Sequence, residues 1–251
     1  MAKFIKLKCR GSFNSFRQAD FHTYHKTLPL PPKTTVAGMI GAALGLSPKA
    51  VNDEWLKNGR FQVGIVGKAG GKANDLWQIR KYEQKTMKAF EKGKVPAPYK
   101  TAVIVRELLF GSTICLYFFL PEDGDKDLLI QGLRSPEWAL SLGREDELIR
   151  IEQLKEVELE AVEGYFFKHT VMKYPSDYEL DNDFMENSGG KNLMASAPIA
   201  YRIPTSFSNP GYAREPDSFE HYLFVSDFPL RPASNSTGFF DPEENWAFQL
   251  I

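Results

Sequence analysis

Two short stretches near the N-terminus carry residue types that can bind or cut RNA. The first, RGSFNSFR, combines guanidinium groups, hydroxyls and two phenylalanines, so it can hold phosphates and stack bases at the same time. We predict a loop that binds RNA through six residues: Arg10, Ser12, Phe13, Ser15, Phe16 and Arg17. The alternative is a turn whose aromatic side chains lie in the core, which we expect of at least one phenylalanine.

The second stretch, HTYHK at residues 22–26, offers groups for acid–base chemistry. Metal-independent RNA cleavage needs a base for the ribose 2′-OH and an acid for the leaving oxygen, which His22, Tyr24, His25 and Lys26 could supply. The stretch fits equally well as a polar loop that binds RNA without cutting it. The chain has only 4 histidines, so we favour binding and expect no catalytic residue. If the chain is an enzyme, Tyr24, His25 and Lys26 are the candidates.

A third stretch, LPLPPKTTVAGMIGAALG at residues 28–45, predicts a stiff proline segment followed by a helix. Thr34 or Thr35 can cap the helix, and Lys33 beside its N-terminus favours a bound phosphate. Glycine costs a helix about 1 kcal/mol relative to alanine, so the glycine stripe indicates a close neighbour. We expect that neighbour to be the sheet.

No other motif indicates a cofactor or a metal. The sequence GKAGGKAN lacks the spacing of a phosphate-binding loop, and GMIGAALG lies inside a presumed helix, so neither predicts a nucleotide cofactor. The pair His22 and His25 has no cysteine or carboxylate at ligand spacing. We therefore expect no cofactor and no metal.

Residues 70–100 form a basic and aromatic segment between two predicted strands, bounded by two glycines and two prolines. Such a composition suits stacking on bases and contact with phosphates. We predict that it is an insertion that binds RNA or a neighbouring subunit, through Trp77, Arg80, Lys81, Tyr82 and Lys100.

The charges of this 251-residue chain are unevenly distributed along the sequence. Residues 1–106 hold 20 Lys+Arg and 6 Asp+Glu, a net +14, whereas residues 107–251 hold 11 (31 − 20) and 26 (32 − 6), a net −15. This asymmetry predicts a polyanion-binding surface, although solvated lysines that only aid solubility would look the same. With no apolar signal segment, no membrane span and only 2 cysteines in strand-like runs, we expect a cytoplasmic protein with buried free thiols.

The order of predicted elements indicates an α+β fold. Strands are predicted at residues 3–9 and 61–67 and as a pair in 101–120 around Gly111 and Ser112, with helices after Thr35 and at 125–133. This order matches a ferredoxin-like βαββαβ unit over residues 1–155. Residues 156–251 read as an acidic, mostly β extension.

Five blocks of sequence, FNSFR, LPLPPKTTVAGMIGAALGL, LWQIRKY, VIVRELLF and SLGREDELI, occur in the order found in the Cas-five family of CRISPR-associated RAMP proteins. The chain resembles this family over roughly residues 3–155, and most closely its type I-B branch. The resemblance implies an RRM-like, ferredoxin-like domain with a protruding thumb at about residues 70–100. It also adds Arg106 and Arg144 to the expected RNA-binding residues.

The resemblance further implies a non-catalytic subunit of a type I surveillance (Cascade) complex. Such a subunit caps the 5′ handle of the crRNA, contacts the backbone and large subunits, and meets target DNA only indirectly. One branch of the family instead processes pre-crRNA with a tyrosine–lysine–histidine set. A metal-independent endoribonuclease is therefore the alternative, and a free-standing RRM-like protein is a third possibility.

Overall fold

The computed structural model describes residues 1–18, 20–21, 24–82, 93, 100–186, 196–209, 214–233 and 237–251. The candidate His22 lies outside the described residues, as do residues 83–92 and 94–99 of the predicted insertion.

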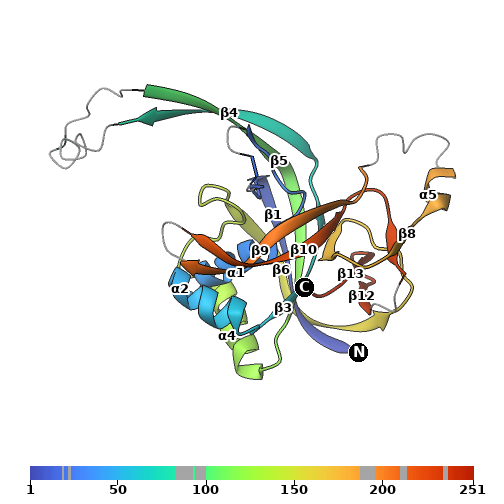
Figure 1. Cartoon of the computed structure of the whole chain (residues 1–251). Coiled ribbons are helices and arrows are strands. Elements are labelled where there is room, and N and C mark those ends of the chain that lie inside the picture. The colour runs from blue at the N-terminus through green and yellow to red at the C-terminus, as the bar shows by residue number, and fades with distance from the viewer. Residues whose placement is uncertain are drawn as a thin grey trace.

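Four strands form the centre of a large antiparallel sheet (Figure 1): β1 (Ala2–Asn14), β3 (Gln62–Lys68), β5 (Lys100–Phe119) and β6 (Ile149–Val162). Their order is β6-β1-β5-β3, and neighbouring strands run antiparallel. Successive side chains of a strand point to opposite faces, so Ile5, Leu7 and Cys9 enter one buried core together. The α+β class predicted from the sequence is confirmed.

Four helical segments cover one face of this sheet (Figure 1): α1 (Lys33–Leu44), α2 (Pro48–Ala50), the π-helix η1 (Val51–Lys57) and α4 (Asp123–Arg134). Four of their apolar side chains are fully buried in the core that contains residues of β1 and β5: Val36, Ile40, Trp55 and Leu129. The strands from β7 onwards and α5 (Asn182–Glu186) belong to the C-terminal part of the chain.

The glycine stripe of α1 does not face the sheet, so that prediction is wrong. The helix contacts the sheet through larger residues such as Val36 and Ile40, while Gly41 lies against η1. A Cβ at Gly41 would come within 2.5 Å of Val51 Cγ2, whereas a Cβ at Gly38 would meet nothing within 4 Å. The predicted threonine cap is also wrong: the N-cap residue is Pro32, and no side chain caps the helix.

The two glycines provide a matched test of this packing. We expect Gly41→Ala to lower the free energy of unfolding by about 1–3 kcal/mol, because the new methyl overlaps the stiff Val51 side chain. Gly38→Ala adds the same methyl in open space and should raise the stability by up to about 1 kcal/mol. Urea denaturation of both variants measures the difference. Equal stabilities would show that η1 does not restrict α1.

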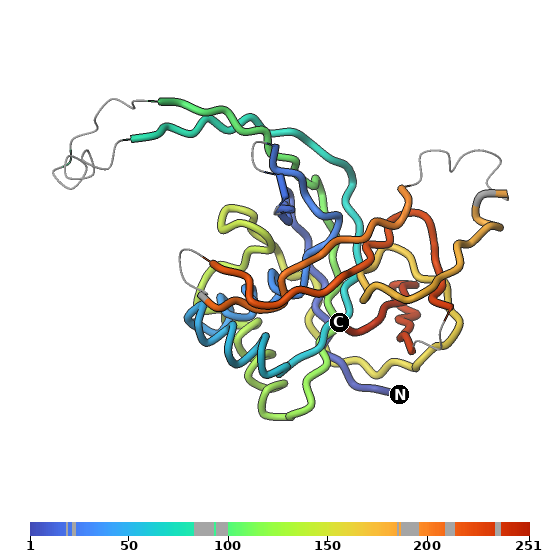
Figure 2. The backbone as a smooth tube through the Cα atoms, in the orientation of Figure 1, coloured from blue at the N-terminus to red at the C-terminus, as the bar shows by residue number. Residues whose placement is uncertain are grey.

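Strand β5 differs from the pair of strands predicted in 101–120. It is one strand of 20 residues, because Gly111 adopts a positive φ of 59° that bends the chain without reversing it. Its inner half pairs with β1 and β3, and its outer half pairs with β4 (Gly71–Lys81) from Gly71↔Phe110 to Lys81↔Lys100. These two strands form a ribbon that extends away from the body (Figure 2).

The C-terminal strands extend the central sheet at both of its edges. At the β3 edge lie β7 (Thr170–Lys173), β10 (Glu215–Val225) and β9 (Ile199–Asn209), and at the β6 edge lie β12 (Gly238–Asp241) and β13 (Trp246–Phe248). A separate two-stranded sheet pairs β8 (Tyr178–Leu180) with β11 (Leu230–Pro232). The division of the chain at residue 155 remains a prediction.

Candidate nucleic-acid interface

A cluster of aromatic and basic side chains lies on the ribbon near the body. Trp77 of β4 is 41% exposed, and the guanidinium groups of Arg106 and Arg144 lie over its ring, 4.9 and 5.1 Å from the centroid. Asp75 pairs with Arg106 across the two strands, which places Trp77 and Arg106 on the same face of the ribbon. The Arg106 Nε donates to Asp75 Oδ2 at 3.0 Å. We call Trp77, Arg106 and Arg144 the Trp77 cluster.

The short strand β2 (Tyr24–His25) brings part of the HTYHK stretch to this cluster. It pairs in parallel with Val105 and Arg106 of β5. The Tyr24 hydroxyl donates to Asn74 Oδ1 at 3.3 Å, and His25 Nδ1 lies 3.3 Å from Arg144 Nη2. Tyr24 is exposed whereas His25 is buried, because adjacent residues of a strand point to opposite faces. The two side chains therefore cannot converge on one substrate atom.

Arg144 is positioned by a buried carboxylate that sequence reasoning missed. Glu147 accepts hydrogen bonds from Ser15 N at 2.7 Å, Ser15 Oγ at 2.5 Å and Arg144 N at 2.9 Å. Asn14 Nδ2 adds a bond to Leu142 O at 2.7 Å. These contacts join the end of β1 to the 141–148 loop, which carries Arg144. Among the many acidic residues of this half of the chain, no feature of the sequence marks Glu147.

Other residues predicted to bind RNA lie elsewhere on the molecule. Residues 10–14 continue β1 and do not form the predicted loop, and Ser15 and Phe16 are buried and have no free surface for RNA. Phe13 remains exposed and contacts the ring of Phe110 at the base of the ribbon, with a centroid distance of 5.7 Å. Three further predicted residues are also exposed: Arg10, Ser12 and Arg17. The Arg10 Nε lies 3.5 Å from the Glu152 carboxylate.

The Lys33-Thr34-Thr35 motif lies on the helical side of the sheet, away from the Trp77 cluster. Lys33 shares a polar cavity of about 410 Å³ with Lys57 and Lys173, and its ammonium lies 5.0 Å from the Phe61 ring centroid. Burial lowers the pKa of Lys33. The Thr35 N–H donates to Pro32 O at 2.9 Å, and Thr34 lines a different cavity. The phosphate role of this motif remains a prediction.

The outer half of the ribbon has further cations. Lys81 and Lys100 are cross-strand partners, and Arg80 pairs with Thr101; all three cations are exposed. Like charges directly opposite each other destabilise a strand pair, so an anion bound there would relieve the repulsion. Tyr82, the residue after β4, is half-buried.

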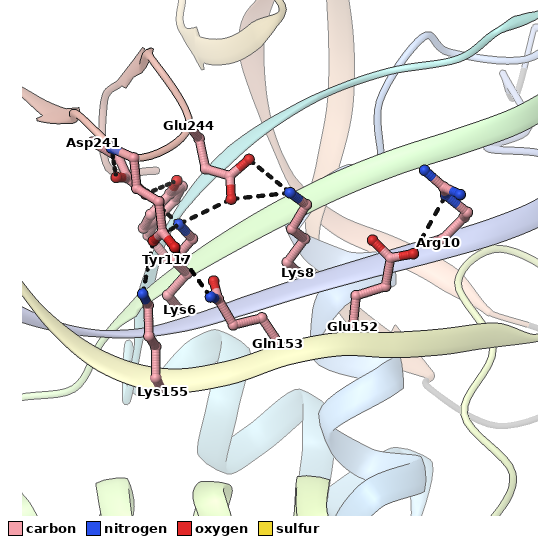
Figure 3. A network of polar contacts seen from close by, with 10 residues as sticks. Lys6, Lys8, Arg10, Tyr117, Glu152, Gln153, Lys155, Asp241 and Glu244 are labelled. Atoms are coloured by element: carbon pink, nitrogen blue, oxygen red, sulfur yellow. Dashed lines mark hydrogen bonds and ion pairs between the residues drawn. The ribbon is translucent and has the colours of Figure 1, made fainter.

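The lysines of β1 do not form the free basic surface that the charge asymmetry predicted. Figure 3 shows that Lys6 and Lys8 lie under the acidic turn after β12. The Lys6 ammonium lies 2.7 Å from Asp241, 2.9 Å from Glu243 and 3.1 Å from Glu244. Burial alone would lower the pKa of Lys6, but these three hydrogen bonds outweigh it and raise that pKa. Part of the acidic half thus neutralises part of the basic half.

Cys9 and Cys115 are free and buried, as predicted, and burial raises the pKa of both thiols to about 12. Among the described residues, no group of three or more His, Cys, Asp or Glu side chains could hold a metal ion. In the same part of the chain, no helix has the length and apolar character required to cross a bilayer.

Comparison with known proteins identifies the family. The profile of the CRISPR-associated protein (Cas_Cas5) family matches residues 4–209. The chain belongs to this family. No curated protein matches the sequence. The Trp77 cluster is therefore a feature of a Cas_Cas5 protein.

Two solved structures share the fold of this Cas_Cas5 protein. A chain of a CRISPR RNA-guided surveillance complex superposes with a TM-score of 0.55 at 16% identity, covering 92% of this chain and 91% of the other. A CRISPR protein from Archaeoglobus fulgidus superposes with a TM-score of 0.50 at 12% identity, covering 98% and 97%. At these identities the similarity concerns the fold.

Proposed function

We propose that this Cas_Cas5 protein is a non-catalytic subunit of a type I CRISPR surveillance complex and binds the single-stranded 5′ handle of the crRNA. The observation that carries the proposal is the Trp77 cluster: an exposed indole beside two guanidinium groups at the base of a protruding ribbon. Indole rings stack on bases, and arginines bind phosphates. The similarity to a chain of an RNA-guided surveillance complex supports this assignment.

The topology supports a ferredoxin-like assignment. The strand order β6-β1-β5-β3, with α1 between β1 and β3 and α4 between β5 and β6, corresponds to a βαββαβ unit whose strands are ordered 4-1-3-2. The ribbon of β4 and β5 then corresponds to the thumb. Its exposed apolar residues Leu76 (71%) and Val103 (57%) suit contact with a neighbouring backbone subunit. Contacts with the large subunit, the indirect contact with target DNA and the type I-B subtype belong to the same proposal.

The geometry does not favour the endoribonuclease alternative. His25 is buried against Arg144, and Tyr24 points to the opposite face of β2. The Lys26 ammonium lies 5.6 Å from the Phe21 ring centroid. A base and an acid must both reach the ribose and its phosphate, which these positions do not allow.

RNA affinity of substituted chains tests the Trp77 cluster. We expect Trp77→Leu to weaken binding of a crRNA-handle oligonucleotide by about 5- to 150-fold, since one base–aromatic stack contributes about 1–3 kcal/mol. Arg144→Gln should also lower the log–log salt slope by about 0.7, the loss of one phosphate contact. Fluorescence anisotropy at several salt concentrations measures both quantities.

Matched controls are available on β4 and on β6. Leu76 is next to Trp77 in β4, but its side chain lies on the opposite face of the ribbon, so Leu76→Ala is one control. Arg150→Gln, the other, removes an exposed arginine that pairs with Glu152. Neither control should change the RNA affinity or the salt slope as much as Trp77→Leu or Arg144→Gln does. Equal losses in the cluster and control variants would contradict a specific site. Cleavage of a repeat RNA at one position without metal would refute the non-catalytic role.

A further inference from the structure

A second cavity has the composition of a nucleotide-binding site. It has a volume of about 560 Å³ and lies where the end of β3 and the 164–169 loop meet the β12–β13 hairpin. Its lining includes three aromatic residues, Tyr165, Phe166 and Trp246, and two lysines, Lys68 and Lys168. Nothing in the Trp77 cluster uses these residues.

The aromatic residues of the cavity remain partly accessible. Tyr165 is 38% exposed, although its ring is tilted against that of Phe240 at a centroid distance of 5.4 Å. Trp246 is half-buried, and Phe166 has the Arg231 guanidinium 5.0 Å from its centroid. Aromatic rings from two separate elements therefore border the same cavity. Such rings accept any base, because every base has a π-face.

The charges around the cavity favour an anion. Among the described residues, neither Lys68 nor Lys168 has a carboxylate within ion-pair distance. The one acidic residue of the lining is Asp181, whose Oδ1 already accepts from Phe184 N at 3.2 Å. Burial, together with Lys168 and Lys68, lowers the pKa of His169 to about 4, so this lining residue is neutral at physiological pH. The lining thus carries two lysines against one carboxylate, while Asp227 acts on His169 from the adjoining cavity and the Lys168 ammonium lies 5.0 Å from the Phe184 ring centroid.

A neighbouring cavity lies between this one and the base of the ribbon. This neighbouring cavity, of about 190 Å³, shares Lys68 and His169 with the first one and also reaches Lys72, close to where β4 begins. The Lys72 ammonium lies 3.4 Å from Glu107, whose other carboxylate oxygen accepts from Thr27 N at 3.0 Å. Thr27 is two residues from His25. The shared lining residues therefore connect the cavity only to the start of β4, where Lys72 points to the ribbon face opposite Trp77.

We propose that this cavity is a second subsite for single-stranded RNA, in which a base stacks on Tyr165 or Trp246 and Lys68 and Lys168 hold the adjoining phosphates. The subsite rests on the proposed function in that it needs this chain to bind single-stranded RNA. It would lengthen the stretch of RNA that one copy of this chain holds.

Anisotropy with a fluorescein-labelled 12-nucleotide oligouridylate and the full chain tests the subsite. We expect Tyr165→Leu to weaken binding by about 5- to 20-fold through loss of one stacked base. Lys168→Gln should reduce the log–log salt slope by about 0.7. The matched controls Tyr174→Leu, at an exposed tyrosine outside the cavity, and Lys49→Gln, at an exposed helix residue, should bind as the parent does.

The pattern of losses separates this subsite from the Trp77 cluster. If Trp77→Leu weakens binding while Tyr165→Leu and Lys168→Gln match the parent, the subsite is refuted and the proposed function stands. If only the Tyr165 and Lys168 variants lose affinity, the subsite stands and the Trp77 cluster fails. If the parent chain binds no RNA, both are overturned. Should Tyr165→Leu fail to fold, the salt slope of Lys168→Gln decides.

Discussion

Replacing Lys6 by methionine is expected to lower the free energy of unfolding by about 3–5 kcal/mol, because it leaves the buried Asp241 carboxylate without its cation. Glu244 keeps its ion pair with Lys8 at 2.9 Å. The Lys6 side chain is fully buried, and it contacts Asp241 and Glu244, whose side chains are 4% and 12% exposed (Figure 3). Asp241 keeps the hydrogen bond from the Tyr117 hydroxyl at 2.7 Å, but within the described part of the chain Lys6 is its one ion-pair partner. Urea denaturation measures the loss.

A control substitution separates this effect from the general loss of a lysine. Lys155→Met removes another partner of Glu243: the Lys155 ammonium lies 2.7 Å from the Glu243 carboxylate. The side chains of Lys155 and Glu243 are 40% and 48% exposed. Exposed pairs contribute about 0–1 kcal/mol, so this variant should stay within that range of the parent. If Lys6→Met is no less stable than Lys155→Met, the buried network does not hold the acidic turn against β1.

The cost of Lys6→Met should also depend on pH. Hydrogen bonds from Lys155 and Lys6 lower the pKa of Glu243 to about 2, below its ordinary value of about 4.3. A carboxylate with a depressed folded pKa stabilises the fold above its unfolded pKa, and this stabilisation is lost as the pH falls through the folded pKa. The stability difference between parent and variant should therefore shrink as the pH falls from about 4.3 to about 2.

Local patterns predicted most of the central elements. Alternation of apolar and basic residues located β1, and the regions of β3, α1 and α4 were also recognised. The single strand β5 was not recognised, because a Gly-Ser pair between two apolar runs looks the same in a hairpin and at a bend. The pairing partners distinguish a bend from a hairpin: β4 pairs with the outer half of β5, and β1 pairs with its inner half.

Patterns of spacing and charge did not identify the partners of these elements. The glycines of α1 did indicate a close approach, yet the neighbour is Val51 of η1, and its side chain meets only Gly41. Similarly, composition revealed the opposite charges of the two halves. It could not show that Lys6 meets Glu243 across 237 residues of sequence, because such contacts exist only after the sheet has formed.

The candidate site was predictable in part. Trp77, Arg106 and Arg144 were each singled out, from three separate segments, and the structure brings them together. Their juxtaposition depends on the register of β4 on β5 and on Glu147, which fixes the loop of Arg144. Neither leaves a local signal in the sequence.

Shortening the ribbon is expected to abolish assembly with a backbone subunit while the body stays folded. Replacing residues 79–102 by Asn-Gly keeps Gln78↔Val103 as the last pair and closes it with a two-residue type I′ turn. The body should keep its stability, because the residues of the removed part that the structure describes contribute nothing to the core clusters. Trp77, Arg106 and Arg144 all remain. Co-purification with the co-expressed backbone subunit and crRNA measures assembly.

A second variant distinguishes apolar contact from charge at the ribbon. Leu76 and Val103 are exposed and lie diagonally on one face, so Leu76→Ser with Val103→Ser removes the apolar contact and keeps Arg80, Lys81 and Lys100. We expect this variant to assemble poorly while its RNA affinity and salt slope match the parent. The shortened ribbon, which lacks those three cations, should bind RNA with a lower salt slope. If the shortened chain enters the complex as the parent does, the ribbon is not an assembly element, and the neighbouring subunit must contact the body.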